Sequence, residues 1–134
     1  MTRRLAALVL GSAPALALSA ATQTPSVLAQ AQPGLWEISG VPGAAALRQC
    51  VADVALLARF EQREKSCKEH TVHEAGTLTV IDYSCGPAGF GHSEVTLLTP
   101  RSLRVATQGI SQGLPFNYVF QAHRIGDCAA AQRH

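Results

Sequence analysis

The chain has 134 residues, which is the length of one domain, and a formal net charge of +2. Two of its eleven Lys and Arg residues, Arg3 and Arg4, lie at the extreme N-terminus, so the remaining chain has nine basic and nine acidic residues. A balanced charge of this kind lacks the excess of positive charge that phosphate backbones require, and it argues against nucleic-acid binding.

The first predicted element is a secretory signal peptide. Arg3 and Arg4 precede an apolar run over residues 5–18, which Pro14 interrupts and which is too short to span a bilayer as a helix. Candidate cleavage sites follow at Ser19-Ala20-Ala21, Val27-Leu28-Ala29 and Ala29-Gln30-Ala31. We expect cleavage between Ala20 and Ala31, a periplasmic or secreted protein, and no transmembrane anchor in the mature form. An uncleaved anchor is the alternative.

These boundaries define the expected domain organisation. Residues 1–31 form the signal peptide and a processed or disordered lead-in, residues 32–128 form a single disulfide-stapled domain rich in β-structure, and residues 129–134 form a disordered tail.

Short strand patterns separated by turn residues run through most of the domain. The predicted strands cover residues 35–39, 45–51, 69–73, 77–84, 92–98, 103–110 and 116–124. The period changes once, where Val54, Leu57 and Phe60 follow Asp53, a good capping residue, and predict a helix over 53–64. The fold class is therefore mainly β (α+β). We expect an antiparallel meander of about seven strands, curled as a half-barrel or small barrel, with the helix covering one side.

Four cysteines lie after the apolar run: Cys50, Cys67, Cys85 and Cys128. An even number in a small exported domain predicts disulfides, and the wide spacing lacks the close pairs of a zinc site. Cys67 and Cys85 flank one predicted hairpin, and Cys128 approaches Cys50 if the last strand pairs with the first. This geometry favours Cys67–Cys85 with Cys50–Cys128. The alternative is Cys50–Cys67, bracketing the helix, with Cys85–Cys128.

Aromatic side chains are the candidates for a core or an apolar pocket. Phe116, Tyr118 and Phe120 alternate along the last predicted strand and therefore share one face. Such a stripe packs in a core, or lines a pocket where the sheet stays open. Trp36, the only tryptophan, is expected to anchor the core while its indole N–H bonds one acceptor.

The segment Gly91-His92-Ser93-Glu94-Val95 is the nearest approach to a catalytic motif. It lacks the last glycine of a nucleophile elbow, and no helix follows the serine. Because neighbours in a strand face opposite ways, Ser93 cannot bond to His92 or Glu94. We therefore expect no catalytic residue. The alternative is a hydrolase-like enzyme with a dispersed site that includes His92, Ser93, Glu94 and His123.

Histidines supply the remaining candidates for a metal site. His70 and His73 are three residues apart in a predicted strand, so we expect them on opposite faces, where they cannot share an ion without distortion. We expect neither a metal nor a cofactor.

The segment Pro33-Gly34-Leu35-Trp36-Glu37, shortly after a signal peptide, resembles the start of an exported bacterial family known as domain of unknown function 3617. Members of that family have a cysteine before a helix, one after it, one ending a strand, and Gly-Asp-Cys near the C-terminus. These positions match Cys50, Cys67, Cys85 and Gly126-Asp127-Cys128. The similarity covers residues 33–128. Val51-Ala52-Asp53 departs from the Thr-Pro-Glu that often follows the first cysteine, which leaves the helix cap less clear. The resemblance implies an exported domain rich in β-structure. It suggests no particular activity, because none is assigned to the family.

Three functional hypotheses follow. The first is a non-enzymatic periplasmic module that binds an apolar small molecule, a lipid or an envelope protein. The second is the dispersed enzyme, and the third is a structural or inhibitory partner protein that uses a sheet edge. A closed apolar cavity would favour the first, a polar cleft with convergent His and Glu the second, and a featureless surface the third.

Overall fold

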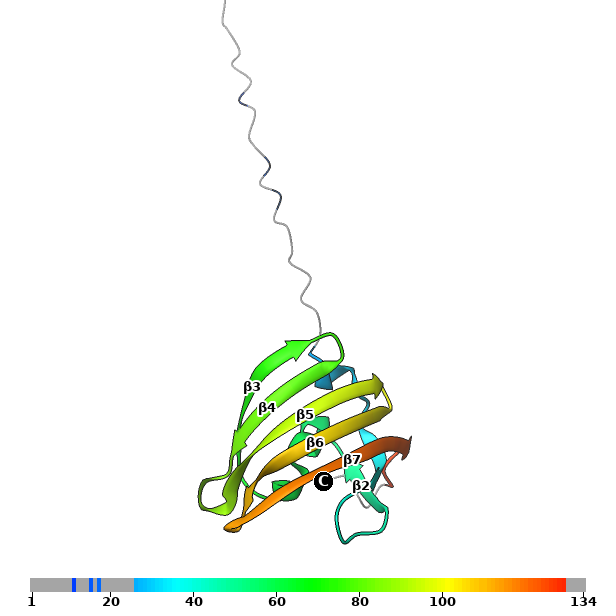
Figure 1. Ribbon diagram of the computed structural model, residues 1–134. Coiled ribbons are helices and arrows are strands. Elements are labelled where there is room, and N and C mark those ends of the chain that lie inside the picture. Colours follow the sequence, from blue (N-terminus) through cyan, green and yellow to red (C-terminus); the bar gives the residue numbers. More distant parts are fainter. Residues whose placement is uncertain (1–10, 12–14, 16, 18–25, 130–134) are drawn as a thin grey trace, which may run out of the picture.

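The computed structural model describes residues 26–129 and the single positions 11, 15 and 17. Apart from those three positions, the apolar run of the predicted signal peptide lies outside the described residues, and so does 130–134 of the predicted tail. Seven strands follow one another along the chain (Figure 1). They are β1 (Gly34–Ser39), β2 (Leu47–Val51), β3 (Lys68–Ala75), β4 (Leu78–Ser84), β5 (Gly89–Thr99), β6 (Ser102–Ser111) and β7 (Leu114–Gly126).

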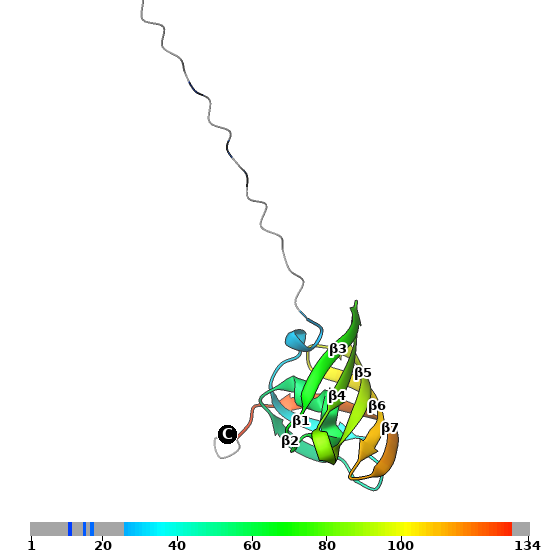
Figure 2. The ribbon, with the colours of Figure 1, turned by 90° about the vertical axis from the view of Figure 1, so that its left-hand side faces the viewer.

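All seven strands belong to one antiparallel sheet with the order β2-β1-β7-β6-β5-β4-β3. The predicted meander is confirmed, and the last strand pairs with the first. The sheet curls without closing, because β2 and β3 remain as its two edges. Figures 1 and 2 show this curl, with a helical segment lying inside it. Of the two predicted shapes, the half-barrel is the one observed.

The predicted helix is present as η2 (Val54–Gln62), a 3₁₀-helix rather than an α-helix. Asp53 begins it, because its carboxylate accepts the Ala55 N–H at 3.0 Å. The apolar residues Val54, Leu57 and Phe60 are spaced by three, and three residues make one 3₁₀ turn, so all three can be buried along the same side. Two shorter 3₁₀ turns, η1 (Leu28–Gln30) and η3 (Gly86–Ala88), complete the elements.

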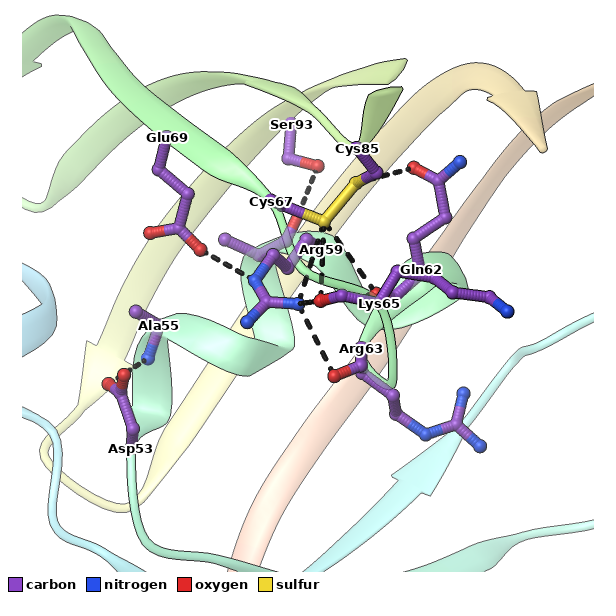
Figure 3. Close-up of polar contacts among 11 residues, drawn as sticks. Asp53, Ala55, Arg59, Gln62, Arg63, Lys65, Cys67, Glu69, Cys85 and Ser93 are labelled. Carbon is purple, nitrogen blue, oxygen red and sulfur yellow. Dashed lines mark hydrogen bonds and ion pairs between the residues drawn. A yellow bond between two sulfur atoms is a disulfide. The ribbon is translucent and has the colours of Figure 1, made fainter. Parts of the chain in front are cut away.

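A break in helical geometry at Arg59 (φ −121°, ψ 39°) divides η2 into two parts. The Arg59 guanidinium lies 2.7 Å from Glu69 of β3, and it donates to the carbonyls of Gln62 and Lys65 at 3.2 and 3.0 Å (Figure 3). One side chain therefore holds together the carbonyl groups at the end of the helix and the start of β3.

Residues of alternate positions in the strands point into the curl and form the core with η2. Trp36, Val95, Leu103, Val105 and Phe120 are buried there almost completely. The core also reaches further toward the N-terminus than the sequence suggests, because Val27 and Ala31 of the expected lead-in are buried in it.

Two disulfides join Cys50 to Cys128 and Cys67 to Cys85. This is the pairing that strand geometry favours over the alternative. Cys67 and Cys85 adjoin the register pair Lys68 and Ser84 at the open end of the β3–β4 hairpin. The two disulfides indicate an oxidising compartment outside the cytoplasm. Within the described residues, no helix combines the length and apolar character needed to cross a membrane.

Candidate functional site

The predicted aromatic stripe lies on the inner face of β7 and packs against the helix. Phe120 is buried, with its ring centroid 5.3 Å from that of Phe60 of η2. Tyr118 is half-buried and donates a hydrogen bond of 2.8 Å to Glu61 of η2. Burial and this bond together raise the pKa of Tyr118. η2 thus covers this part of the stripe, which makes Phe120 and Tyr118 part of the packing and leaves half-buried Phe116 at its end.

Trp36 is completely buried on the inner face of β1. Its indole N–H donates to the Gln32 carbonyl at 3.0 Å, so the ring fills the core while its polar atom is satisfied. Both observations agree with the expected anchoring role.

Ser93 is also buried on the inner face, and its hydroxyl lies 2.5 Å from the Ala58 carbonyl and 2.8 Å from the Thr107 hydroxyl. Figure 3 shows the Ser93 side chain directed toward the helix. His92 and Glu94, its neighbours in β5, point to the other face. The structure therefore separates the serine from both, as the alternation of a strand requires.

His92 belongs to a polar row that crosses four strands on the outer face. Register pairs join Asp82 of β4 to His92 of β5, His92 to Gln108 of β6, and Gln108 to Asn117 of β7. The His92 Nδ1 atom lies 2.5 Å from an Asp82 carboxylate oxygen. An imidazole held by a carboxylate, with two amides in line, offers both donors and acceptors to a bound molecule.

An apolar row runs parallel to this polar row. It is displaced along each strand by two residues, to the next outward-facing position. Phe90 pairs with Ile110, and Ile110 with Pro115. Phe90 is 56% exposed, although aromatic side chains are more often buried.

A hollow of about 630 Å³ lies between the two rows, and both contribute to its lining. The register pair Gly91 and Gly109 lies between the two rows and also lines the hollow. Tyr83 presses on Gly91 from the inner face: a Cβ atom on Gly91 would lie 2.3 Å from the Tyr83 ring. The close approach of Tyr83 to the inner face of the sheet therefore depends on glycine at position 91.

A smaller hollow of about 180 Å³ lies on the other side of the polar row. Glu94 and Ala106 line it together with His92, Gln108 and Asn117. The polar row thus stands between two depressions and can contact a molecule that occupies either of them.

None of the other histidines lines the hollow, although His70 pairs in register with Asp82 at the β3 end of the polar row. His123 Nε2 lies 3.8 Å from a Glu37 carboxylate oxygen across the β1–β7 pair. The expectation that His70 and His73 face opposite ways is wrong, because a β-bulge at Val72 shifts the register and pairs them with Asp82 and Val80, which share a face. Even so, no group of three residues that could hold a metal ion occurs within the described part of the chain.

Sequence reasoning identified His92 and Glu94 but missed Asp82, Phe90, Gln108 and Asn117. The signal that could have found them is strand register. Counting outward from the β4–β5 and β5–β6 turns aligns Asp82 and Gln108 with His92.

Comparison with known proteins identifies the family of the chain. The family model described as a protein of unknown function, DUF3617, matches residues 31–128. Neither a curated protein nor a solved structure matches the chain. The family match spans β1 to Cys128 and so includes all seven strands, both disulfides and the hollow. The chain therefore belongs to the DUF3617 family.

Proposed function

We propose that this protein is a non-enzymatic binding module of the bacterial periplasm, which holds a small amphipathic molecule in the outer hollow of its sheet. Its apolar part would lie on Phe90 and Ile110, and its polar part would bond to the row from Asp82 to Asn117. The hollow between these two rows is the single observation that carries the proposal.

The hollow has the size and lining of a ligand site. Its volume of about 630 Å³ falls within the range of small-molecule pockets, roughly 300–1,000 Å³. The apolar side supplies contact area, since burying an exposed aromatic side chain contributes about 1.5–3 kcal/mol. The polar side supplies orientation, because carboxylate, imidazole and amide groups fix where donors and acceptors of the ligand must lie.

The contacts of His92 favour binding over catalysis. A nucleophile needs a base within about 3 Å. Asp82 is the hydrogen-bond partner of His92. The hydroxyl of the adjacent Ser93 donates to the Ala58 carbonyl on the opposite face. The Asp82 and His92 pair is therefore a recognition group in this proposal.

Export through a signal peptide is the second part of the proposal. Arg3 and Arg4, the apolar run over 5–18 and the small residues after it support a secretory signal. The two disulfides support the same destination, because the periplasm is oxidising.

Native mass spectrometry of protein purified from the periplasm tests the binding function. We expect a retained small molecule on the parent protein and its loss from Phe90→Ser. The matched control is Leu98→Ser, because Leu98 lies on the same strand and outer face, is 52% exposed, and does not line the hollow.

The result that would contradict the proposal is a ligand that both variants keep or both lose equally. A retained polypeptide in place of a small molecule would also contradict it, and would support an envelope protein as the partner. Circular dichroism of each variant ensures that the folded protein is compared.

A further inference from the structure

We infer that residues 26–32 remain in the exported protein as part of its fold, so that the signal peptide is cut before Ser26, at Ser19-Ala20-Ala21. This inference rests on the export proposed above. It excludes both later sites, Val27-Leu28-Ala29 and Ala29-Gln30-Ala31, although their residue types suit the peptidase equally well.

Burial of the segment is the first observation. Val27 is 2% exposed and Ala31 is 6% exposed, and both belong to the core cluster that includes residues of η2. Leu28 is half-buried against the same cluster. An unstructured lead-in would have no reason to place two apolar residues in a core, because ordering a segment costs roughly 1–2 kcal/mol per residue.

Hydrogen bonds fix the segment to two distant parts of the sheet. The Val27 N–H donates to the Glu74 carboxylate at the end of β3, and the Gln32 N–H donates to the Pro100 carbonyl between β5 and β6 at 2.8 Å. The Gln32 carbonyl accepts the Trp36 indole N–H. In both views the segment lies at the end of the sheet where the β3–β4 turn is found (Figures 1 and 2).

Each later cut would remove part of this structure. A cut after Ala29 removes Val27 from the core and its bond to Glu74. A cut after Ala31 also removes Ala31 and creates a charged amino group at Gln32, beside the carbonyl that satisfies the buried Trp36. A cut after Ala21 removes none of these contacts, which is why the structure distinguishes three sites that the sequence leaves equal.

Intact mass of the protein recovered from the periplasm tests the inference directly. We expect an N-terminus at Thr22, the residue that follows Ser19-Ala20-Ala21. A mass that begins at Gln30 or Gln32 would overturn the inference while leaving export intact. A mass that includes Met1 would overturn export itself, together with the inference that rests on it.

Two substitutions distinguish the candidate cleavage sites by signal-peptide processing, without a measurement of stability. Ala29→Asp places a carboxylate directly before the first later cut and three residues before the second, so it blocks both, whereas Ala21→Asp blocks the early cut. We expect Ala29→Asp to be processed like the parent and Ala21→Asp to accumulate with its signal peptide. The reverse pattern would overturn the inference.

The structural part is tested by thermal unfolding of the exported protein. Val27→Asp introduces an unpaired charge into the core, and we expect it to lower the melting temperature by roughly 5–15 °C or to prevent folding. Val27→Thr, which keeps the shape and adds a hydroxyl, should give a smaller decrease in a folded protein. Ala29→Asp is the matched control, because Ala29 is exposed. Equal melting temperatures for Val27→Thr, Ala29→Asp and the parent would show that the segment is dispensable.

Discussion

The two faces of the sheet are made by the same strands and have opposite surroundings. Ser93 and Thr107 lie on the inner face beneath η2, and each has a neighbour on the outer face, His92 and Gln108, that lines the hollow. One residue along the chain therefore separates a side chain packed against the helix from one that lines the hollow. The inner face of the half-barrel is covered by η2, so the hollow in which we propose that a ligand binds lies on the outer face.

Of the changes that this comparison predicts, loss of the Trp36 side chain should have the largest effect on stability. Trp36→Ala removes a fully buried side chain from the inner face and should lower the free energy of unfolding by about 3–5 kcal/mol. Phe90→Ala, the corresponding truncation on the outer face, should change it by less than about 0.5 kcal/mol. Urea unfolding measures both. Similar losses for the two variants would contradict the division between faces.

Gly91, which lets the Tyr83 ring approach the inner face closely, should give the next largest effect. Gly91→Ala would place its Cβ atom 2.3 Å from the Tyr83 ring, so the ring must move, and overpacking of this kind costs about 1–3 kcal/mol. Gly126→Ala is the control, because nothing lies within 4 Å of its Cβ position. Thermal unfolding of both variants tests whether Tyr83 must approach position 91 closely. We expect a lower melting temperature for Gly91→Ala but not for Gly126→Ala.

Substitutions of Ser93 and His92 test whether adjacent side chains of β5 have different roles on the two faces of the sheet. Ser93→Ala leaves the buried Ala58 carbonyl without the serine hydroxyl and should cost about 1–3 kcal/mol of stability. His92→Ala should leave stability nearly unchanged, because its pair with Asp82 is partly exposed and such pairs contribute about 0–1 kcal/mol. The ligand response should be the opposite, with retention lost only in His92→Ala. Loss of the ligand from a folded Ser93→Ala variant would contradict this assignment.

The sequence predicts the architecture of this chain better than its site. Period-two alternation and turn residues suffice for the seven strands, because those signals are local. The sequence predicts a helix at η2 but not its 3₁₀ geometry, because apolar residues spaced by three also occur in α-helices. Asp82, His92, Gln108 and Asn117 come from four strands, and only the register between strands aligns them. The bulge at Val72, which turns His70 and His73 to one face, has no clear sequence signal.

The smallest predicted effect concerns Tyr118, whose hydroxyl bonds to Glu61 of η2 on the inner face. Burial and its bond to Glu61 raise the pKa of Tyr118 above its ordinary value of 10.0, so the folded state keeps the phenol proton that the unfolded state loses. Its contribution to stability is therefore complete below pH 10 and falls as the pH rises further. Burial raises the pKa of Tyr83 in the same direction.

Tyr118→Phe removes both the hydrogen bond and the titration. At pH 8 the variant should lose about 0.5–1.5 kcal/mol, the net contribution of one hydrogen bond. Above pH 10 its stability should fall less steeply with pH than that of the parent, because only Tyr83 still titrates with a raised pKa among the tyrosines of the described chain. Urea unfolding at pH 8, 10 and 11 measures the slopes. Parallel pH profiles for the two proteins would mean that the Tyr118 phenol is not held by Glu61, and that this part of the inner face is open to water.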